Sequence, residues 1–142
     1  MGRLENKIVL ITGSTSGIGL ASAKLALKEN AARVILSSQN GNSNEEMPES
    51  LGDNCEWIKL DGRSEKDWET AIGFIETKYG RLDVLINNAG ITGTKLKSKA
   101  LGLEETSFES WKEVLSVNLD GIFLGCKSAM KLMSKSVSAS IV

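Results

Sequence analysis

The sequence predicts an α/β fold with a doubly wound parallel sheet, and two observations support this class. Short apolar runs alternate four times with segments of helical periodicity along the 142 residues. This alternation is typical of strands and helices joined by right-handed crossovers, with helices on both faces of the sheet. The first apolar run also ends in a glycine-rich turn, after which a helical pattern begins. The length is that of one domain, so residues 1–142 are expected to form a single unit.

Five short runs are predicted to be strands because they are apolar and are bounded by glycine or polar residues. They cover residues 7–12, 33–37, 55–60, 82–86 and 138–142, and the sequence stops within the fifth. Four segments are predicted to be helical: residues 17–30, a short stretch around 44–51, residues 65–79, and one long helix over 108–134. Residues 91–106 are expected to form an irregular loop.

The spacing of apolar residues predicts which face of each helix is buried. In residues 17–30 the predicted buried set is Ile18, Ala21, Ser22, Leu25 and Ala26. In residues 65–79 it is Trp68, Ala71, Ile72 and Ile75. In the long helix the apolar set is Trp111, Val114, Leu115, Val117, Ile122, Phe123, Cys126, Met130 and Met133.

The glycine turn after the first strand favours the sheet order 3-2-1-4, with the fifth strand beside the fourth. Ligands of such sheets bind at the carboxyl ends of the strands, where the strand order reverses beside strand one. Gly13, Ser38, Asp61 and Asn87 all follow predicted strands at that edge. We therefore expect a ligand site there.

The turn itself, residues 12–19, reads TGSTSGIG and has the spacing Gly-x-x-x-Gly-x-Gly. Glycine admits the backbone angles of a tight strand-to-helix turn, and a phosphate reaches main-chain N–H groups only where no side chain intervenes. The helix that begins there directs the positive end of its dipole at the ligand. The spacing differs from the Gly-x-Gly-x-x-Gly fingerprint, so a glycine-rich turn without a ligand is the competing interpretation. The polar residues at the other strand ends favour a dinucleotide.

Composition narrows the function. The net charge of −1 gives no sign of electrostatic capture of nucleic acid or of an anionic membrane. No apolar run approaches the roughly 20 residues that span a bilayer, and no signal peptide is recognised, so we expect a cytoplasmic protein. Cys55 and Cys126 are expected to be reduced, buried thiols rather than metal ligands. Histidine is absent, which excludes Ser-His and Cys-His nucleophilic machinery and most zinc chemistry within these residues.

Four motifs in register resemble the short-chain dehydrogenase/reductase (SDR) family over essentially the whole sequence. They are residues 12–19, Asp61 after the third strand, the segment NNAG at residues 87–90, and VNL at residues 117–119. The resemblance implies a Rossmann-type fold and an NAD(P)-dependent oxidoreductase of alcohols and carbonyl compounds. It also implies that the long helix packs in a homo-oligomer of the complete enzyme.

The resemblance also implies roles for individual residues. Gly13, Gly17, Ile18 and Gly19 would wrap the pyrophosphate, with Thr12 and Ser16 in the same turn. Asp61 and Gly62 would contact the adenine. The remaining nucleotide contacts would come from Asn88, Ala89 and Gly90, and the catalytic tetrad would include Asn118.

Each of these roles has a structural alternative. Asp61 is also a suitable cap for the helix that follows it. The Asn87 amide is as suited to bridging two neighbouring strands as to cofactor contact. Asn118 lies mid-helix, where most asparagines are solvated or locally bonded. Three lysines in the predicted loop over residues 91–106 are expected to be a solvated surface rather than a phosphate clamp: Lys95, Lys97 and Lys99.

The family's proton-transfer machinery is not found in these residues. In the family a tyrosine and a lysine stand as Tyr-x-x-x-Lys, one helical turn apart, and a serine follows strand five. The one tyrosine here, Tyr79, is followed four residues later by Asp83. The sequence is therefore expected to correspond to an amino-terminal portion, incomplete at its carboxyl end. A non-catalytic nucleotide-binding module or pseudoenzyme, and a non-functional remnant, are the alternatives to an oxidoreductase.

The cofactor preference depends on the end of the second strand. An acidic residue there binds the ribose hydroxyls of NAD and repels the 2′-phosphate of NADP. Ser38 and Gln39 occupy this position, so the repulsion is absent, although no arginine stands there either. The sequence favours NADP over NAD slightly. Substrate identity stays open.

Overall fold

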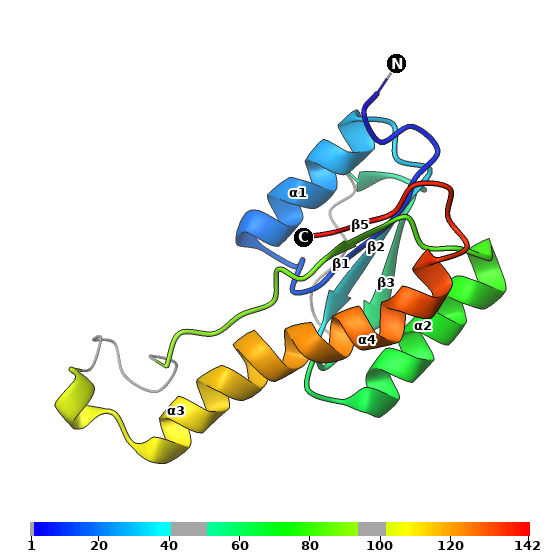
Figure 1. Cartoon of the computed structure of the whole chain (residues 1–142). Coiled ribbons are helices and arrows are strands. Elements are labelled where there is room, and N and C mark those ends of the chain that lie inside the picture. Colours follow the sequence, from blue (N-terminus) through cyan, green and yellow to red (C-terminus); the bar gives the residue numbers. More distant parts are fainter. Residues whose placement is uncertain (1, 41–50, 94–101) are drawn as a thin grey trace.

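A five-stranded parallel sheet forms the centre of the computed structural model, which describes residues 2–40, 51–93 and 102–142. The strands are β1 (Ile8–Ile11), β2 (Arg33–Ser38), β3 (Cys55–Lys59), β4 (Val84–Ile86) and β5 (Ser140–Ile141). Their order is β3-β2-β1-β4-β5, with every pair parallel (Figure 1). The order predicted from the sequence is confirmed, and the predicted strands differ from the observed ones only at their ends.

β1 is apolar throughout because both faces of the sheet are covered. Its side chains alternate between two cores, as the two-residue period of a strand requires. Ile8 and Leu10 face α2 (Glu65–Tyr79) and α4 (Gly121–Met133), whereas Val9 and Ile11 face α1 (Gly17–Lys28). All four are 5% exposed or less. The doubly wound prediction is confirmed.

The buried face of α1 differs from the predicted one. Gly19, Ala23 and Ala26 are buried, while Ile18 is 79% and Leu25 is 49% exposed. The glycine turn fixes the rotation of this helix, because Gly19 lies directly on the main chain of Gly13. Small residues at positions 19, 23 and 26 then face the sheet, Leu20 and Leu27 pack beside them, and Ile18 and Leu25 turn outward.

α2 buries the predicted residues Trp68, Ala71 and Ile75, with Ile72 half-buried. The Ser64 hydroxyl caps its start by accepting a hydrogen bond from the N–H of Asp67 at 3.1 Å. Gly80 ends the helix with φ +72°, a left-handed conformation that favours glycine. The short helix expected around residues 44–51 lies almost entirely outside the described residues.

The predicted long helix is continuous but not uniform. α3 (Phe108–Leu115) runs through a π-turn, η3 (Ser116–Asp120), into α4 (Figure 1). α4 packs through Gly121, which approaches Gly62, and Gly125, which approaches Trp68 and Asn87. This contact leaves part of the predicted apolar set exposed: Trp111, Ile122, Phe123 and Met130. The loop before α3 contains a 3₁₀ turn, η2 (Leu103–Glu105), where an irregular loop was expected.

Candidate nucleotide-binding site

A cleft of about 440 Å³ opens over the carboxyl ends of the central strands. Each of four strand ends contributes residues to it, as expected for the switch point of a doubly wound sheet. Nine of the predicted cofactor-binding residues line the cleft: Gly13, Ser16, Ser38, Gln39, Asp61, Gly62, Asn88, Ala89 and Gly90. Six lining residues were not predicted: Thr15, Leu60, Arg63, Ile91, Glu113 and Val117.

Three glycines in the turn meet different demands. Gly13 has φ +60°, and a Cβ there would lie 2.8 Å from the Cα of Ala89. A Cβ at Gly19 would lie 2.5 Å from the carbonyl oxygen of Gly13 and 2.6 Å from Nδ2 of Asn88. Gly17, with φ +54°, has no atom within 4 Å of where its Cβ would be. Gly13 and Gly19 therefore close the turn, and Gly17 leaves open space beside it.

The amino end of α1 starts at this open space. Ser16 is its N-cap residue, but the Ser16 side chain makes no capping hydrogen bond. The first N–H groups of a helix have no partner within the helix, and they carry the positive end of its dipole. This end of α1 is therefore suited to a phosphate. Thr12, Gly17, Ile18 and Gly19 do not line the cleft; they shape or border the turn.

Side chains from neighbouring strands hold the turn in place. Asn88 Nδ2 donates to the carbonyl oxygens of Thr12 at 3.0 Å and Gly13 at 2.9 Å. Ser14, which is fully buried, accepts from the N–H of Ser37 at 2.9 Å and donates to the carbonyl of Ile11 at 2.8 Å. The turn is thereby tied to both neighbours of β1. The amide that joins the ends of β4 and β1 is therefore that of Asn88. The Asn87 amide instead lies 3.8 Å from the sulfur of Cys126.

Asp61 does not cap the following helix, so that alternative is wrong; Ser64 caps it. Asp61 instead forms an ion pair with Arg63, whose Nη2 lies 2.8 Å from Oδ2. Gln39, from the end of β2, donates to the same oxygen at 3.0 Å. The hydrogen bond from Arg63 lowers the pKa of Asp61 to about 2 despite partial burial, so the carboxylate stays charged. Arg63 was not predicted to belong to the site, and its only sequence signal is a basic residue two positions after Asp61.

Asn118 lies in the π-turn and holds the loop after β4. Its Oδ1 accepts from the N–H of Ile91 at 2.8 Å, and its Nδ2 donates to the carbonyl of Ile91 at 2.9 Å. Both ends of the amide are therefore used, and Gly90 lies close against it. A π-turn of this kind is common at functional sites. The contact places Asn118 beside the cleft wall formed by Gly90, Ile91 and Val117.

Other predicted features lie away from the cleft or outside the described residues. The Tyr79 hydroxyl donates to Glu56, which pairs with Lys78 at the carboxyl end of α2, and none of the three residues lines the cleft. Cys55 and Cys126 are free thiols; Cys55 is buried as predicted, whereas Cys126 is only half-buried. Among residues 2–40, 51–93 and 102–142, no cluster has the composition of a metal site, and no helix is long and apolar enough to cross a bilayer. Lys95, Lys97 and Lys99 fall outside these residues.

The strand order, with a glycine turn after the central strand, defines a Rossmann-like α/β protein. Residues 7–142 match the family model described as short chain dehydrogenase. The chain therefore belongs to the short-chain dehydrogenase family, and the resemblance inferred from its motifs is confirmed.

Several characterised proteins are similar to this chain. Zerumbone synthase of Zingiber zerumbet is 34% identical over 99% of the chain and 51% of its own length. An NADP-dependent (R)-specific alcohol dehydrogenase of Lentilactobacillus kefiri is 34% identical over 99% of the chain and 54% of its own length. A Brucella melitensis crystal structure, titled a short-chain dehydrogenase/reductase, glucose/ribitol dehydrogenase, superposes with a TM-score of 0.80 at 30% identity and covers 93% of the chain. The chain spans about half the length of these relatives.

Proposed function

We propose that this chain supplies the nucleotide-binding unit of an NAD(P)-dependent oxidoreductase acting on a small alcohol or carbonyl compound. The observation that carries the proposal is the cleft at the strand ends, with the open space at Gly17 beside the amino end of α1. A bound nicotinamide dinucleotide would supply the hydride chemistry, and the protein residues would bind and orient it. Residues 1–142 form the Rossmann-type binding unit in this proposal.

The residues present fit a dinucleotide. A pyrophosphate would lie where Gly17 leaves space, within reach of the uncapped N–H groups at the start of α1. The adenosine would lie toward the ends of β2 and β3, beside Ser38, Gln39, Asp61 and Gly62. The rest of the dinucleotide would lie along the wall of the cleft that residues 88–90 form.

The slight preference for NADP inferred from the sequence is part of this proposal. Neither Ser38 nor Gln39 carries the negative charge that would repel a 2′-phosphate. One relative of this chain is named as NADP-dependent, which supports the same choice.

The catalytic role proposed within these residues is that of Asn118. Its amide fixes the loop after β4 against the π-turn and so keeps this wall of the cleft in place. The proton donor of the reaction is not Tyr79, because that hydroxyl is bonded to Glu56 away from the cleft. A nucleotide-binding module without catalysis is the second candidate, since no Tyr-x-x-x-Lys pair occurs in the 142 residues.

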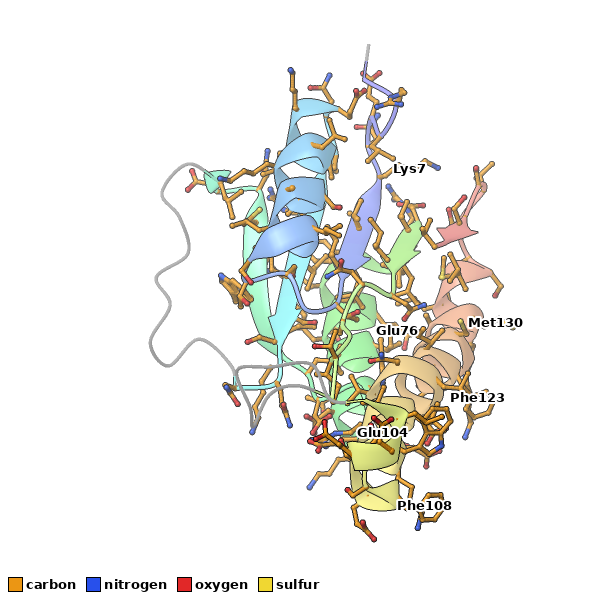
Figure 2. The ribbon with its side chains drawn as sticks, turned by 90° about the vertical axis from the view of Figure 1, so that its left-hand side faces the viewer. Lys7, Glu76, Glu104, Phe108, Phe123 and Met130 are labelled. Atoms are coloured by element: carbon orange, nitrogen blue, oxygen red, sulfur yellow. The ribbon has the colours of Figure 1, made fainter. Side chains whose placement is uncertain are left out.

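We further propose a homo-oligomer that packs through the long helix. Leu119, Phe123 and Met130 are each at least 60% exposed, and they recur at helical spacing. Figure 2 shows Phe123 on the outer side of the helix, and Met130 lines a hollow beside β5. Cytoplasmic location is likewise a proposal, consistent with the free thiols of Cys55 and Cys126.

Calorimetric titration with NAD and NADP tests the binding function, using the variant Gly17→Glu. The glutamate would fill the pyrophosphate position with a negative side chain, and we expect affinity for both dinucleotides to fall at least about a hundredfold. Gly80→Glu is the matched control, because Gly80 also has a positive φ, +72°, and open space around its Cβ position. It lies at the end of α2, outside the cleft lining. Equal affinities in the two variants would refute the proposed site.

An activity measurement separates the two candidate functions. The full-length protein, with residues beyond 142 if the gene encodes them, is incubated with secondary alcohols and either dinucleotide while reduced nicotinamide is followed by absorbance. Turnover that Gly17→Glu abolishes supports the oxidoreductase. Dinucleotide binding without turnover of any alcohol or ketone supports the binding module.

A further inference from the structure

Ser14 continues the bonding between β1 and β2 beyond the point where β1 ends. The last paired residues of these two strands are Ile11 and Leu36. One step further along, the N–H of Ser14 donates to the carbonyl oxygen of Ser37 at 3.1 Å, and the Ser14 Oγ accepts from the N–H of Ser37 at 2.9 Å. A residue of the glycine turn therefore engages both polar groups of the Ser37 main chain.

The Ser14 hydroxyl is also bonded to the strand that precedes the turn. It donates to the carbonyl oxygen of Ile11 at 2.8 Å, so this one oxygen joins the end of β1 to the end of β2. Ser14 is fully buried and Ser37 is 1% exposed, so bulk water does not compete for these bonds. These three hydrogen bonds, the Ser14 clasp, use the donor of the hydroxyl and one of its acceptor sites, which fixes its orientation.

The Ser14 clasp joins two separate parts of the cleft wall. Thr15 and Ser16, which follow Ser14 in the chain, line the cleft, and so does Ser38, which follows Ser37. The first two belong to the turn where a pyrophosphate would lie, whereas Ser38 belongs to the end of β2, where a ribose would lie. The ADP part of a dinucleotide must contact both parts at once. The spacing between them therefore affects how tightly it binds.

We propose that the Ser14 hydroxyl holds the pyrophosphate and ribose subsites at the spacing of one nucleotide. Two contacts made by one ligand reinforce each other only when the protein already holds them at the ligand's own spacing. Ser14 is a positioning residue in this role, because its buried side chain acts through the main chain of Ser37 and of the turn. The inference rests on the proposed function, since it requires a nucleotide in the cleft.

Three ligands measure this spacing by calorimetric titration of the full-length protein and of Ser14→Ala. Inorganic pyrophosphate contacts the turn, adenosine contacts the ends of β2 and β3, and ADP contacts both. The product of the first two dissociation constants, divided by that of ADP, is an effective concentration that reports how well the two subsites act together. We expect it to fall about tenfold in Ser14→Ala, while pyrophosphate and adenosine each bind within about twofold of their original affinity.

Ser37→Ala is the matched control. It removes a hydroxyl that is almost as buried as that of Ser14, yet the Ser14 clasp uses only the main chain of Ser37. The bond that it loses, from the Ser37 Oγ to the carbonyl oxygen of Ile11, is long at 3.4 Å. The effective concentration should therefore change less than about twofold. An equal fall in both variants, or an unchanged value in Ser14→Ala, would overturn the proposal.

A merely structural role of Ser14 predicts the opposite sign. If Ser14→Ala only lowered the fraction of folded protein, it would weaken pyrophosphate, adenosine and ADP by the same factor. The effective concentration contains two dissociation constants in its numerator and one in its denominator, so its apparent value would then rise. A rise in Ser14→Ala would overturn the proposal, whereas a fall supports it.

Hydrogen exchange of the unaltered protein provides a test that does not depend on how a variant folds. If the Ser14 clasp forms before a ligand binds, ADP should raise the protection of the Ser14 and Ser37 amides no more than it raises that of the amides within β1. A gain about tenfold larger than in β1 would show that the clasp forms only with the ligand, and would overturn the proposal.

The same titrations distinguish failure of this inference from failure of the proposed function. An unaltered protein that binds neither ADP nor either dinucleotide would refute the proposed function itself. ADP binding that Gly17→Glu weakens, together with an effective concentration that Ser14→Ala leaves intact, would support the proposed site and overturn the role of Ser14 alone.

Discussion

Replacing Gly19 by alanine is expected to disrupt the turn more than replacing Gly17 by alanine, although of these two glycines it is Gly17 that has a positive φ. At Gly19 the new Cβ would lie 2.5 Å from the Gly13 carbonyl oxygen, 2.6 Å from Nδ2 of Asn88 and 2.8 Å from the Cα of Ser14. Two of these atoms belong to the main chain of the turn and cannot rotate away. The turn must therefore open or Asn88 must leave.

The cost can be worked out from these contacts. Displacing the Asn88 amide removes its hydrogen bonds to Thr12 and Gly13, each contributing about 1 kcal/mol to stability. Overpacking against the rigid turn adds about 1–3 kcal/mol. The free energy of unfolding should fall by about 3–5 kcal/mol in Gly19→Ala. Gly17→Ala meets open space and should lose only the about 1–2 kcal/mol of left-handed backbone strain.

Urea unfolding followed by circular dichroism, on both variants and the unaltered protein, measures this difference. We expect a lower midpoint with an unchanged denaturant slope, because the core is not altered. Nucleotide affinity should respond in both variants, since the turn is distorted in one and its open space is narrowed in the other. A Gly19→Ala variant within about 1 kcal/mol of Gly17→Ala would refute the steric argument.

Three further predictions concern other parts of the chain. Burial raises the pKa of Asp83, but hydrogen bonds from Ser136, Ile8 and Arg81 outweigh burial and lower that pKa, so the stability that Asp83 contributes above about pH 4 is lost as the pH falls. Asp83→Asn should therefore reduce the dependence of stability on pH in the acid range, which urea midpoints between about pH 2 and about pH 6 measure. Ser38→Asp should shift the ratio of catalytic efficiencies toward NAD, and an unchanged ratio would place Ser38 away from the ribose. The polypeptide of residues 1–142 should oxidise no alcohol, because it lacks a Tyr-x-x-x-Lys pair; activity above a Gly17→Glu control would contradict this.

The strands and their order follow from local pattern. β1 is a short apolar run that ends at a glycine turn, and a strand buried on both faces needs such a run whatever its neighbours are. The turn after the central strand then fixes where the strand order reverses. The positions of Ser38, Asp61 and Asn88 at the cleft follow from the same rule, because the carboxyl ends of parallel strands lie at one edge.

The helix faces depend on contacts that no periodicity reveals. In α1 the sequence offers Ile18 and Leu25 as apolar residues, yet both are exposed because Gly19 must lie against Gly13. In α4 the glycines 121 and 125 approach Gly62 and Trp68, which turns Phe123 outward. A helix that packs closely against another segment needs its smallest residues at the contact. A prediction from apolar spacing instead assigns the largest apolar residues to the buried face.

The polar contacts of the site were also beyond sequence reasoning, because they join residues far apart in the chain. Asn88 reaches the carbonyls of Thr12 and Gly13 across 75 or more positions, and Gln39 reaches Asp61 across 22. Only their placement at neighbouring strand ends was predictable. Which amide bridges, and which cation pairs with Asp61, depends on side-chain directions that the register sets.

These long-range contacts explain how a turn made largely of small residues keeps one shape. Glycine lowers the steric cost of the turn but leaves the unfolded chain with more conformations to lose. The ordering is imposed from outside: Asn88 holds the carbonyls of the turn from the β4 side, and Ser14 is held by Ser37 from the β2 side. Among the residues that the structure describes, no hydrogen bond joins the N–H groups of residues 17–19 to β2 or β4. The turn can therefore be rigid before a ligand binds while the donors that a phosphate would use remain available.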